Sequence, residues 1–284
     1  MNDSGRAARI FLEAARLNRE DPLLHGSLLV FPKYGQLVMT GDLHGHRRNF
    51  ERLQRFCDLA HFGARHVILH ELIHEDLPTL TSRDLSHQVL LEAAKWKCEF
   101  PDQVHFLLSN HELAQLLGNE ISKNGRVVTV AFEESVKETY DAGAEQVLDA
   151  INVLIRSYPL GGRTPHRVFV SHSLPGPREL ERFDPLVFSR TPEEADFADG
   201  GSAHALVWGR YQTPPVMATL GDWLEADFFI CGHQPQETGY EVLHDRMIIL
   251  ASDHNHGVFL TLDLAKPPTL ESLVKNIRPF AAIA

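Results

Sequence analysis

The stretch QLVMTGDLHGH, residues 36–46, carries the strongest structural signal in this chain. Its apolar run LVM, residues 37–39, is typical of a buried β-strand, and a helix is expected over about residues 46–60. Two polar side chains, Asp42 and His44, follow the strand within a short loop. A strand, a polar loop and a helix in this order are typical of the opening unit of an α/β fold.

Three later segments repeat this arrangement, each with a residue able to bind a metal after an apolar run that predicts a strand. They are Asn110 after residues 104–108, His172 after residues 168–170, and His233 after residues 228–231. Because the carboxyl ends of adjacent strands in an α/β sheet face one crevice, these side chains are expected to meet Asp42 and His44 there. Their oxygen and imidazole donors, without a thiolate, are what a two-metal centre requires.

Alternating strand and helix patterns in the first half predict a parallel sheet. Strands are expected at 28–31, 36–40, 66–71 and 104–108, and helices at 5–19, 46–60, 85–100 and 111–117. The segment of about 119–160 is mostly helical and charged. It is interpreted either as a cap beside the site or as an ordinary surface insertion. We expect a single domain over residues 1–284 that carries this helical insertion.

The second half contains shorter strands and more turns. Residues 240–243, 247–250 and 257–262 predict an antiparallel meander, and a helix over 269–276 is expected to close the chain. This mixture of helices and strands places the chain in the α/β class.

The composition is that of an acidic globular protein. A chain of 284 residues that is 43% hydrophobic can bury a core. The net charge of −11 argues against nucleic acid as a partner, and the lack of a basic amphipathic segment argues against a membrane. The start of the chain lacks a secretory pattern and the three cysteines show no paired spacing, so a cytoplasmic location is expected.

The four polar segments together resemble the calcineurin-like metallophosphoesterases, in particular the Ser/Thr-phosphatase and diadenosine-tetraphosphatase-like branch. The matching segments are GDLHGH (41–46), SNHE (109–112), VSHS (170–173), LVWG (206–209) and CGHQPQETGYEV (231–242). The resemblance covers about residues 36–262. It implies a four-layer sandwich, with two central mixed β-sheets flanked by helices. It also implies two divalent metal ions, with manganese, iron or zinc suited to the mixed donors.

One segment departs from the family pattern GDxxDRG, since this chain reads HELIHED at residues 70–76. The resemblance assigns the metal-bridging role to Glu71, which is one methylene longer than the usual aspartate. His74 stands where the family has the aspartate that orients the catalytic histidine. Glu75 stands where the family has an arginine that holds phosphate.

The resemblance implies a role for each candidate residue. The metal ligands would be Asp42, His44, Glu71, Asn110, His172 and His233, and His111 would be the general acid. Asn110 has an alternative interpretation as a helix cap. Candidates for substrate contact are Arg47, Arg48, Arg210 and His254, although solvated helix faces and a plain turn are the alternatives. His74, Asp76 and Glu112 are expected to contact the ligands without binding a metal themselves. Asp76 or Glu112 is expected to orient His111 in place of the family's aspartate.

These assignments predict a metal-dependent phosphoesterase in which hydroxide activated by two metals attacks phosphorus and His111 protonates the leaving group. The substrate would be a phosphorylated small molecule, such as a phosphomonoester or nucleoside polyphosphate, or a phosphoprotein. The altered segment 70–76 motivates an alternative, a phosphatase-like protein that binds metal or a phosphorylated ligand with impaired turnover. A phosphodiesterase or nuclease is disfavoured by the acidic charge, and the sequence does not determine the oligomeric state.

Overall fold

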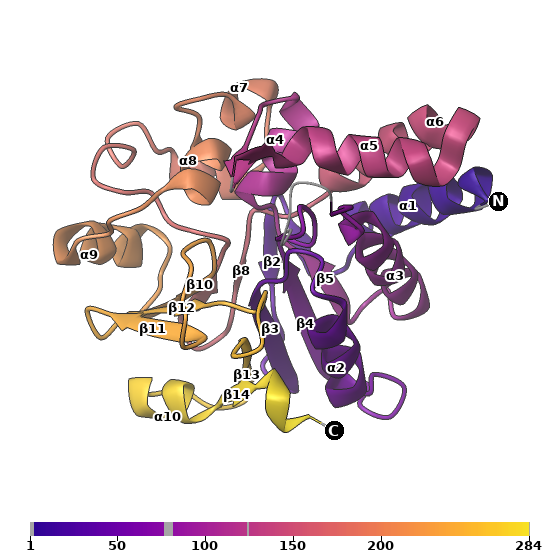
Figure 1. Cartoon of the computed structure of the whole chain (residues 1–284). Helices are drawn as coiled ribbons and strands as arrows, with labels where there is room; N and C mark the ends of the chain where they lie inside the picture. Colours follow the sequence, from indigo (N-terminus) through magenta and orange to yellow (C-terminus); the bar gives the residue numbers. More distant parts are fainter. Residues whose placement is uncertain (1–2, 77–81, 124, 284) are drawn as a thin grey trace.

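The computed structural model describes residues 3–76, 82–123 and 125–283. Two large β-sheets stand face to face at the centre, and helices cover their outer sides (Figure 1). This is the α/β sandwich that the resemblance implied. In Figure 1, α1, α2 and α3 lie beside one sheet, and α8 and α9 lie beyond the other.

The first large sheet has the strand order β14-β13-β3-β4-β5. Its strands are β3 (Gln36–Asp42), β4 (Arg65–His70), β5 (Val104–Phe106), β13 (Val258–Asp263) and β14 (Ile277–Pro279). β3, β4 and β5 run parallel, as the alternation of strands and helices predicted. β13 runs antiparallel to β3 and closes the other side of the sheet with β14.

The second large sheet has the order β1-β2-β8-β9-β10-β12-β11. Its strands are β1 (Leu24–His25), β2 (Leu28–Val30), β8 (Gly161–Arg163), β9 (Val168–Val170), β10 (Phe228–Cys231), β11 (Tyr240–Leu243) and β12 (Met247–Leu250). β9, β10 and β12 are parallel neighbours, so their carboxyl ends reach the same edge.

The helices expected from the sequence are present, whereas α7, α8 and α9 were not predicted. Their bounds are α1 (Ser4–Arg19), α2 (Arg47–Cys57), α3 (Ser86–Glu99), α4 (Asn110–Leu117), α5 (Val128–Tyr140), α6 (Ala144–Ile155), α7 (Glu194–Phe197), α8 (Ser202–Trp208), α9 (Pro214–Trp223) and α10 (Leu270–Lys275). A short hairpin joins β6 (Ser122–Lys123) to β7 (Arg126–Val127), and 3₁₀ turns lie at Asp141–Gly143, Pro185–Ser189 and Phe280–Ala282.

Period-two alternation builds the core between the sheets. Leu37 and Met39 of β3 face the second sheet, whereas Val38 faces the helices. On β4, Ile68 faces the second sheet in the same way. From the opposite side, Ile230 of β10 and other alternate residues complete this layer. Each strand therefore buries both faces, which is why the parallel strands read as continuous apolar runs.

The predicted meander is wrong in part. β11 and β12 are antiparallel neighbours, but β13 leaves them and joins β3 in the other sheet. β13 pairs with β3 because both of its faces carry apolar side chains that need to be buried. Leu260 packs between the sheets, while Phe259 packs outward against Phe56 and Phe280. A strand that is apolar on both faces is most stable in the interior of a covered sheet.

The segment of about 119–160 contains α5 and α6, within the range that was expected to be helical. Both helices pack against neighbours: α6 against α1 and α4, and α5 against α3. The prediction of a single domain with an insertion stays a prediction, and residue 124 lies outside the described residues. Among those described, no helix has both the length and the apolar character needed to cross a bilayer.

A buried charge network lies at the other end of the parallel sheet from the polar loops. Lys97 of α3 donates to Asp21 at 3.0 Å, and both side chains are almost fully buried. His105 of β5 contacts the same carboxylate oxygen at 2.9 Å, and His66 of β4 lies 3.2 Å from His105. The bonds from His105 and Lys97 outweigh burial and lower the pKa of Asp21. This network connects the chain after α1 to the sheet.

We expect Asp21→Asn to lower the free energy of unfolding by roughly 3–5 kcal/mol, because it leaves the Lys97 ammonium buried without its counter-ion. Urea unfolding at neutral pH measures this. Glu92→Gln is the matched control, since it breaks the more exposed Lys95–Glu92 pair and should cost no more than about 1 kcal/mol. Equal stability of the two variants would contradict a stabilising role for the buried pair.

A second expectation concerns stability in acid. Burial lowers the pKa of His66 and of His87 to about 4 from an ordinary value of 6.5. Each ring therefore contributes stability that is fully present above pH 6.5 and is lost as the pH falls toward 4, because the unfolded chain binds these protons first. Unfolding free energies at pH 7 and pH 4.5 should differ by up to ~3 kcal/mol for each ring.

Replacing one ring tests this assignment. His87→Leu should reduce the loss of stability between pH 7 and pH 4.5, whereas His25→Ala, at an exposed position, should leave it unchanged. An undiminished loss in His87→Leu would show that other groups cause the acid sensitivity.

Candidate metal centre

The predicted ligands converge where the two sheets expose their carboxyl ends. β3 ends at Asp42 and β4 ends at His70, and these two residues are paired across the parallel strands after an irregularity in register. The loops after β9 and β10 bring His172 and His233 from the second sheet. Residues distant in sequence thus meet at one edge, as the strand-end argument predicted.

Asp42 is held by the backbone of the second sheet. The amide of His233 donates to its two carboxylate oxygens, at 2.9 and 2.8 Å. A Cβ atom at Gly232 would lie 2.2 Å from Asp42 Oδ1, so only glycine allows this close approach. Burial, and then the nearby Glu71, raise the pKa of Asp42 well above its ordinary value.

Glu71 lies at the centre of the cluster, and its two oxygens face different partners. Oε1 lies 3.2 Å from His44 Nε2 and 3.4 Å from His111 Nε2. Oε2 lies 3.0 Å from His172 Nε2. Burial raises the pKa of Glu71, against the opposing charges of His44 and Lys123.

Asn110 joins the set through its side-chain oxygen. Its Oδ1 lies 2.7 Å from His172 Nε2 and 3.1 Å from His233 Nδ1. The alternative interpretation of Asn110 as a helix cap is wrong, since Ser109 caps α4 by accepting from the amide of Glu112. The amide oxygen is therefore available for the cluster.

A chain of hydrogen bonds defines the proton positions on His111. Gln115 donates from Nε2 to Glu133 at 3.2 Å, which turns its Oε1 toward His74 Nε2 at 2.9 Å. His74 must then donate from Nε2 and accept at Nδ1. The second bond, 2.9 Å between the two Nδ1 atoms, makes His111 the donor. A neutral His111 therefore presents an unprotonated Nε2 to Glu71.

The predicted supporting residues divide into two groups. His74 contacts His111 directly, as described above. Glu112 accepts from the Leu72 amide at 2.8 Å and from the Ser109 hydroxyl, so it holds the loop that carries Glu71. Asp76 forms an ion pair with Lys123 at 3.5 Å. His74 contacts the Nδ1 atom of His111, and the expectation that Asp76 or Glu112 orients the ring stays a prediction.

Several loop residues in the cluster adopt a left-handed backbone. Positive φ values are found at His44 (42°), Glu71 (40°), His74 (62°) and His233 (71°). Such conformations cost free energy in residues other than glycine and concentrate at functional sites. Here the surrounding strand ends and hydrogen bonds hold the loops in place, so the strain supports a functional role for this edge.

The chemistry of the donors fits divalent cations. Two groups have ligand atoms that all lie within 4.8 Å of one another: Asp42, His70 and His172, and His44, Glu71 and His111. Burial lowers the pKa of His172 and of His233, which favours the neutral imidazole that binds metals. Burial raises the pKa of Asp42 and of Glu71, so positive charge near them would stabilise their charged forms.

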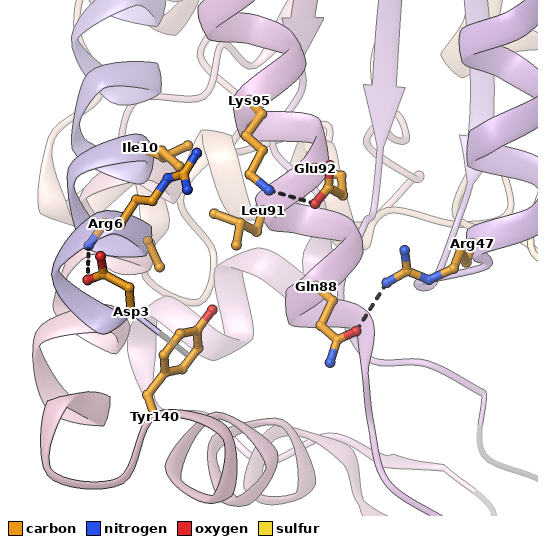
Figure 2. A pocket seen from close by; sticks show the side chains of 10 residues that line it. Asp3, Arg6, Ile10, Arg47, Gln88, Leu91, Glu92, Lys95 and Tyr140 are labelled. Atoms are coloured by element: carbon orange, nitrogen blue, oxygen red, sulfur yellow. Dashed lines mark hydrogen bonds and ion pairs between the residues drawn. The ribbon is translucent and has the colours of Figure 1, made fainter. Parts of the chain in front are cut away.

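The predicted substrate-binding residues are more dispersed. Arg47 donates to Gln88 of α3 at 3.1 Å and lines a pocket of about 440 Å³ between α1 and α3 (Figure 2). Arg48 is exposed on α2, and a ring nitrogen of His254 bonds to the Gln236 carbonyl at 2.9 Å. Arg210 is exposed, and its charge lowers the pKa of Glu71, His172 and His233. Of the four, Arg210 is the one whose charge acts on the cluster.

Sequence reasoning missed Lys123, Gln115 and Glu133. Lys123 lies in the β6–β7 hairpin, and its charge acts on Glu71 and His111. Gln115 was detectable in principle, since it is one helical turn after His111 and so shares its face of α4. No sequence signal connects Lys123 or Glu133 to the strand ends, because only the packing of the helical segment brings them there.

No protein-family model matches the chain, and no curated protein matches it. Solved structures share its fold. A serine/threonine phosphatase from Saccharomyces cerevisiae with similarity to human phosphatase PP5 is 14% identical, with a TM-score of 0.65 over 99% of this chain and 94% of that chain. A cold-active protein-tyrosine phosphatase of a psychrophilic Shewanella species is 14% identical, with a TM-score of 0.57 over 88% and 80% of the two chains. At this identity the likeness describes the fold.

The geometry of Glu71 generates a test of cation binding. We expect Glu71→Gln to lower the number of Mn²⁺ ions bound per chain, because a neutral amide cannot offset the charge of two cations. Equilibrium dialysis followed by elemental analysis measures the stoichiometry. Glu225→Gln, which removes an exposed partner of Arg163, is the matched control. Unchanged metal content in Glu71→Gln would contradict a bridging carboxylate.

Proposed function

We propose that this protein is a metal-dependent phosphoesterase that hydrolyses phosphate esters with the aid of two divalent cations. Manganese, iron or zinc suit the mixed nitrogen and oxygen donors. The proposed substrates are phosphorylated small molecules or phosphoproteins, and the proposed setting is the reducing cytoplasm.

One observation carries the proposal: the Glu71 carboxylate lies between two sets of donors. Its Oε1 faces His44 and its Oε2 faces His172, each at about hydrogen-bond distance, 3.2 and 3.0 Å. A carboxylate whose two oxygens face different imidazoles is suited to bridging two cations. The shared fold with phosphatases supports the same interpretation.

The ligand roles follow from this arrangement. Glu71 would lie between the two cations, and Asp42, His44, Asn110, His172 and His233 would supply their other ligand atoms. When bound, such cations neutralise phosphate charge and make a water molecule a stronger nucleophile at neutral pH. The strand ends and the Ser109 cap fix these side chains before a substrate arrives, which lowers the cost of assembling the site.

His111 is the proposed proton donor to the leaving oxygen. Its Nδ1 is bonded to His74, so in the protonated ring Nε2 would carry the proton that is transferred. His74, held by Gln115, acts as a positioning residue that restricts ring rotation. Burial, and then the nearby rings of His44 and His74, lower the pKa of His111, which would make it a ready proton donor once protonated.

Phosphate would be attracted by Lys123 and Arg210. Their charges reach Glu71 in a chain whose net charge is −11. Glu75 cannot serve this purpose, because it is acidic and accepts from the Leu85 amide at 3.1 Å. Lys123 would therefore supply the positive charge that binds phosphate, which the arginine supplies in the family pattern.

A second candidate function is a phosphatase-like binding protein with impaired turnover. The same Glu75 favours it, since it places a carboxyl group where the resembling pattern has a phosphate-binding arginine. Binding without hydrolysis would need the cation cluster and Lys123 but not His111.

Hydrolysis of p-nitrophenyl phosphate with Mn²⁺ separates the two candidates. We expect the wild type to turn over and His111→Ala to lower kcat by a factor of about 10²–10⁴, because general acid catalysis is lost. His61→Ala, at an exposed position, is the control. Wild-type protein that binds two Mn²⁺ ions without hydrolysing any phosphate ester would support the binding protein, and activity unaffected by His111→Ala would remove His111 from the mechanism.

The role of Lys123 is tested separately. Lys123→Gln should raise KM for p-nitrophenyl phosphate several-fold with little change in kcat, because the charge attracts the anion in both ground and transition states. Lys137→Gln, which neutralises an exposed lysine of α5, should leave KM unchanged. An equal KM for Lys123→Gln and wild type would remove Lys123 from substrate binding.

A further inference from the structure

His70 is a buried imidazole whose ring lacks a hydrogen-bond partner within the described residues. It is the last residue of β4 and follows Ile68 by two positions, so its side chain lies on the face that looks toward the second sheet. Its exposed fraction is 0%, and neither ring nitrogen is hydrogen bonded. An unsatisfied buried polar group costs roughly 1–3 kcal/mol. An apolar side chain would fill the same space without that cost.

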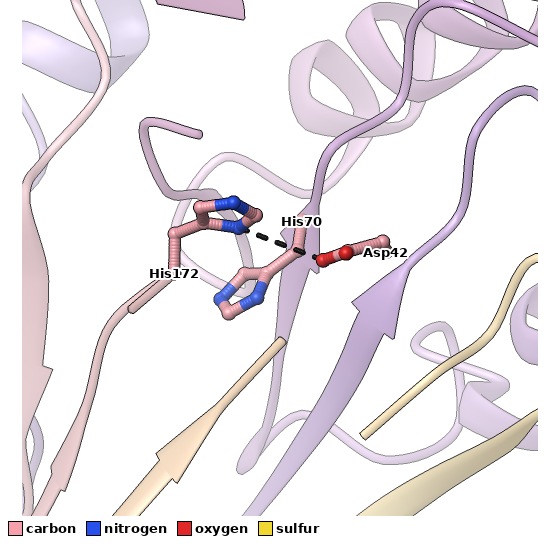
Figure 3. A group of neighbouring side chains, drawn as sticks. All are labelled: Asp42, His70 and His172. Atoms are coloured by element: carbon pink, nitrogen blue, oxygen red, sulfur yellow. Dashed lines mark ion pairs between the residues drawn. The ribbon is translucent and has the colours of Figure 1, made fainter. Parts of the chain in front are cut away.

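Two predicted metal ligands lie beside the His70 ring. The strand register pairs His70 with Asp42, and His172 approaches both from the loop after β9. His172 Nδ1, which has no hydrogen bond to the described residues, lies 3.5 Å from Asp42 Oδ1. Figure 3 shows the three side chains converging from their separate strand ends. One ligand atom from each lies within 4.8 Å of the other two.

We propose that His70 is itself a metal ligand and that it joins Asp42 and His172 around one of the two cations. This inference rests on the proposed function for the presence of that cation. The resembling pattern GDxxDRG has a glycine at this position, which offers no donor, so the imidazole is an addition of this chain. A bound cation would satisfy the ring and so offset the cost of burying it.

The added ligand changes the chemistry of that cation. A set of two imidazoles and one carboxylate is the donor set of many zinc sites, and imidazole also suits iron and cobalt. Sites richer in oxygen favour manganese or magnesium. We therefore expect the cation beside His70 to be bound as Zn²⁺ in preference to Mn²⁺.

Metal affinity of His70→Leu and His70→Asn tests the inference. Zn²⁺ affinity is measured by chelator competition, and Co²⁺-loaded protein is examined for its visible absorption bands, which report ligand number and geometry. Loss of outer partners of a metal already costs about 10–100-fold in affinity, so removal of a direct ligand should weaken one of the two bound ions by at least that factor. The Co²⁺ bands should change in both variants.

His87→Leu is the matched control, since His87 is equally buried but lies on α3, in neither of the two metal-competent groups. It should leave Zn²⁺ affinity and the Co²⁺ spectrum unchanged. Thermal unfolding without metal checks that both His70 variants fold. Because the substitution to leucine removes an unsatisfied ring, metal-free His70→Leu should melt no lower than the wild type.

The outcomes separate this inference from the proposed function. Two bound ions with weakened binding and altered Co²⁺ bands in the His70 variants support the ligand role, even if no phosphate ester is hydrolysed. Wild-type affinity and spectrum in both variants overturn it and leave the proposed function intact. A wild type that binds no cation overturns both.

Discussion

The burial of two carboxylates side by side, Asp42 and Glu71, is the constraint on which the rest of this site depends. Both are removed from water, which raises the pKa of each, and Glu71 raises the pKa of Asp42 further. Such a pair is stable only with positive charge or protons between its members. Burial lowers the pKa of His111 and of His172, so these two rings are disfavoured as sources of that charge. A divalent cation relieves the repulsion most directly.

The fold makes that arrangement possible without long polar loops. Both sheets bury their faces, so the polar groups are confined to the strand ends. The β3–β4 pairing sets Asp42 beside His70, and the amide of His233 reaches across from the second sheet to fix the Asp42 carboxylate. The ligands are therefore fixed by strand register and backbone amides, which are rigid, and the centre needs little reorganisation when it is occupied.

In the segment HELIHED, residues 70–76, the carboxylate of Glu71 still reaches the cluster, but the residue that contacts His111 is a histidine. Glu71 still reaches the cluster, with a left-handed backbone that places its longer side chain. His74 contacts the His111 ring, and the orientation of His74 is set by Gln115 and Glu133 from two helices. This relay ties the geometry of His111 to the packing of α4 and α5. The segment that contains α5 therefore helps to position residues of the site.

The sequence by itself determined the parallel β3–β4–β5 unit and the order of the polar segments, because apolar periodicity and strand-end loops are local properties of the chain. It also predicted that Asp42, His44, Glu71, Asn110, His172 and His233 would meet. Only the tertiary structure decided that β13 joins β3 and that Lys123 and Glu133 reach the cluster. Those facts depend on packing between segments distant in the chain, for which the local pattern carries no signal. For His70, the sequence predicted its place at the end of a strand. Only the tertiary structure showed that its ring lies beside Asp42 without a hydrogen-bond partner among the described residues.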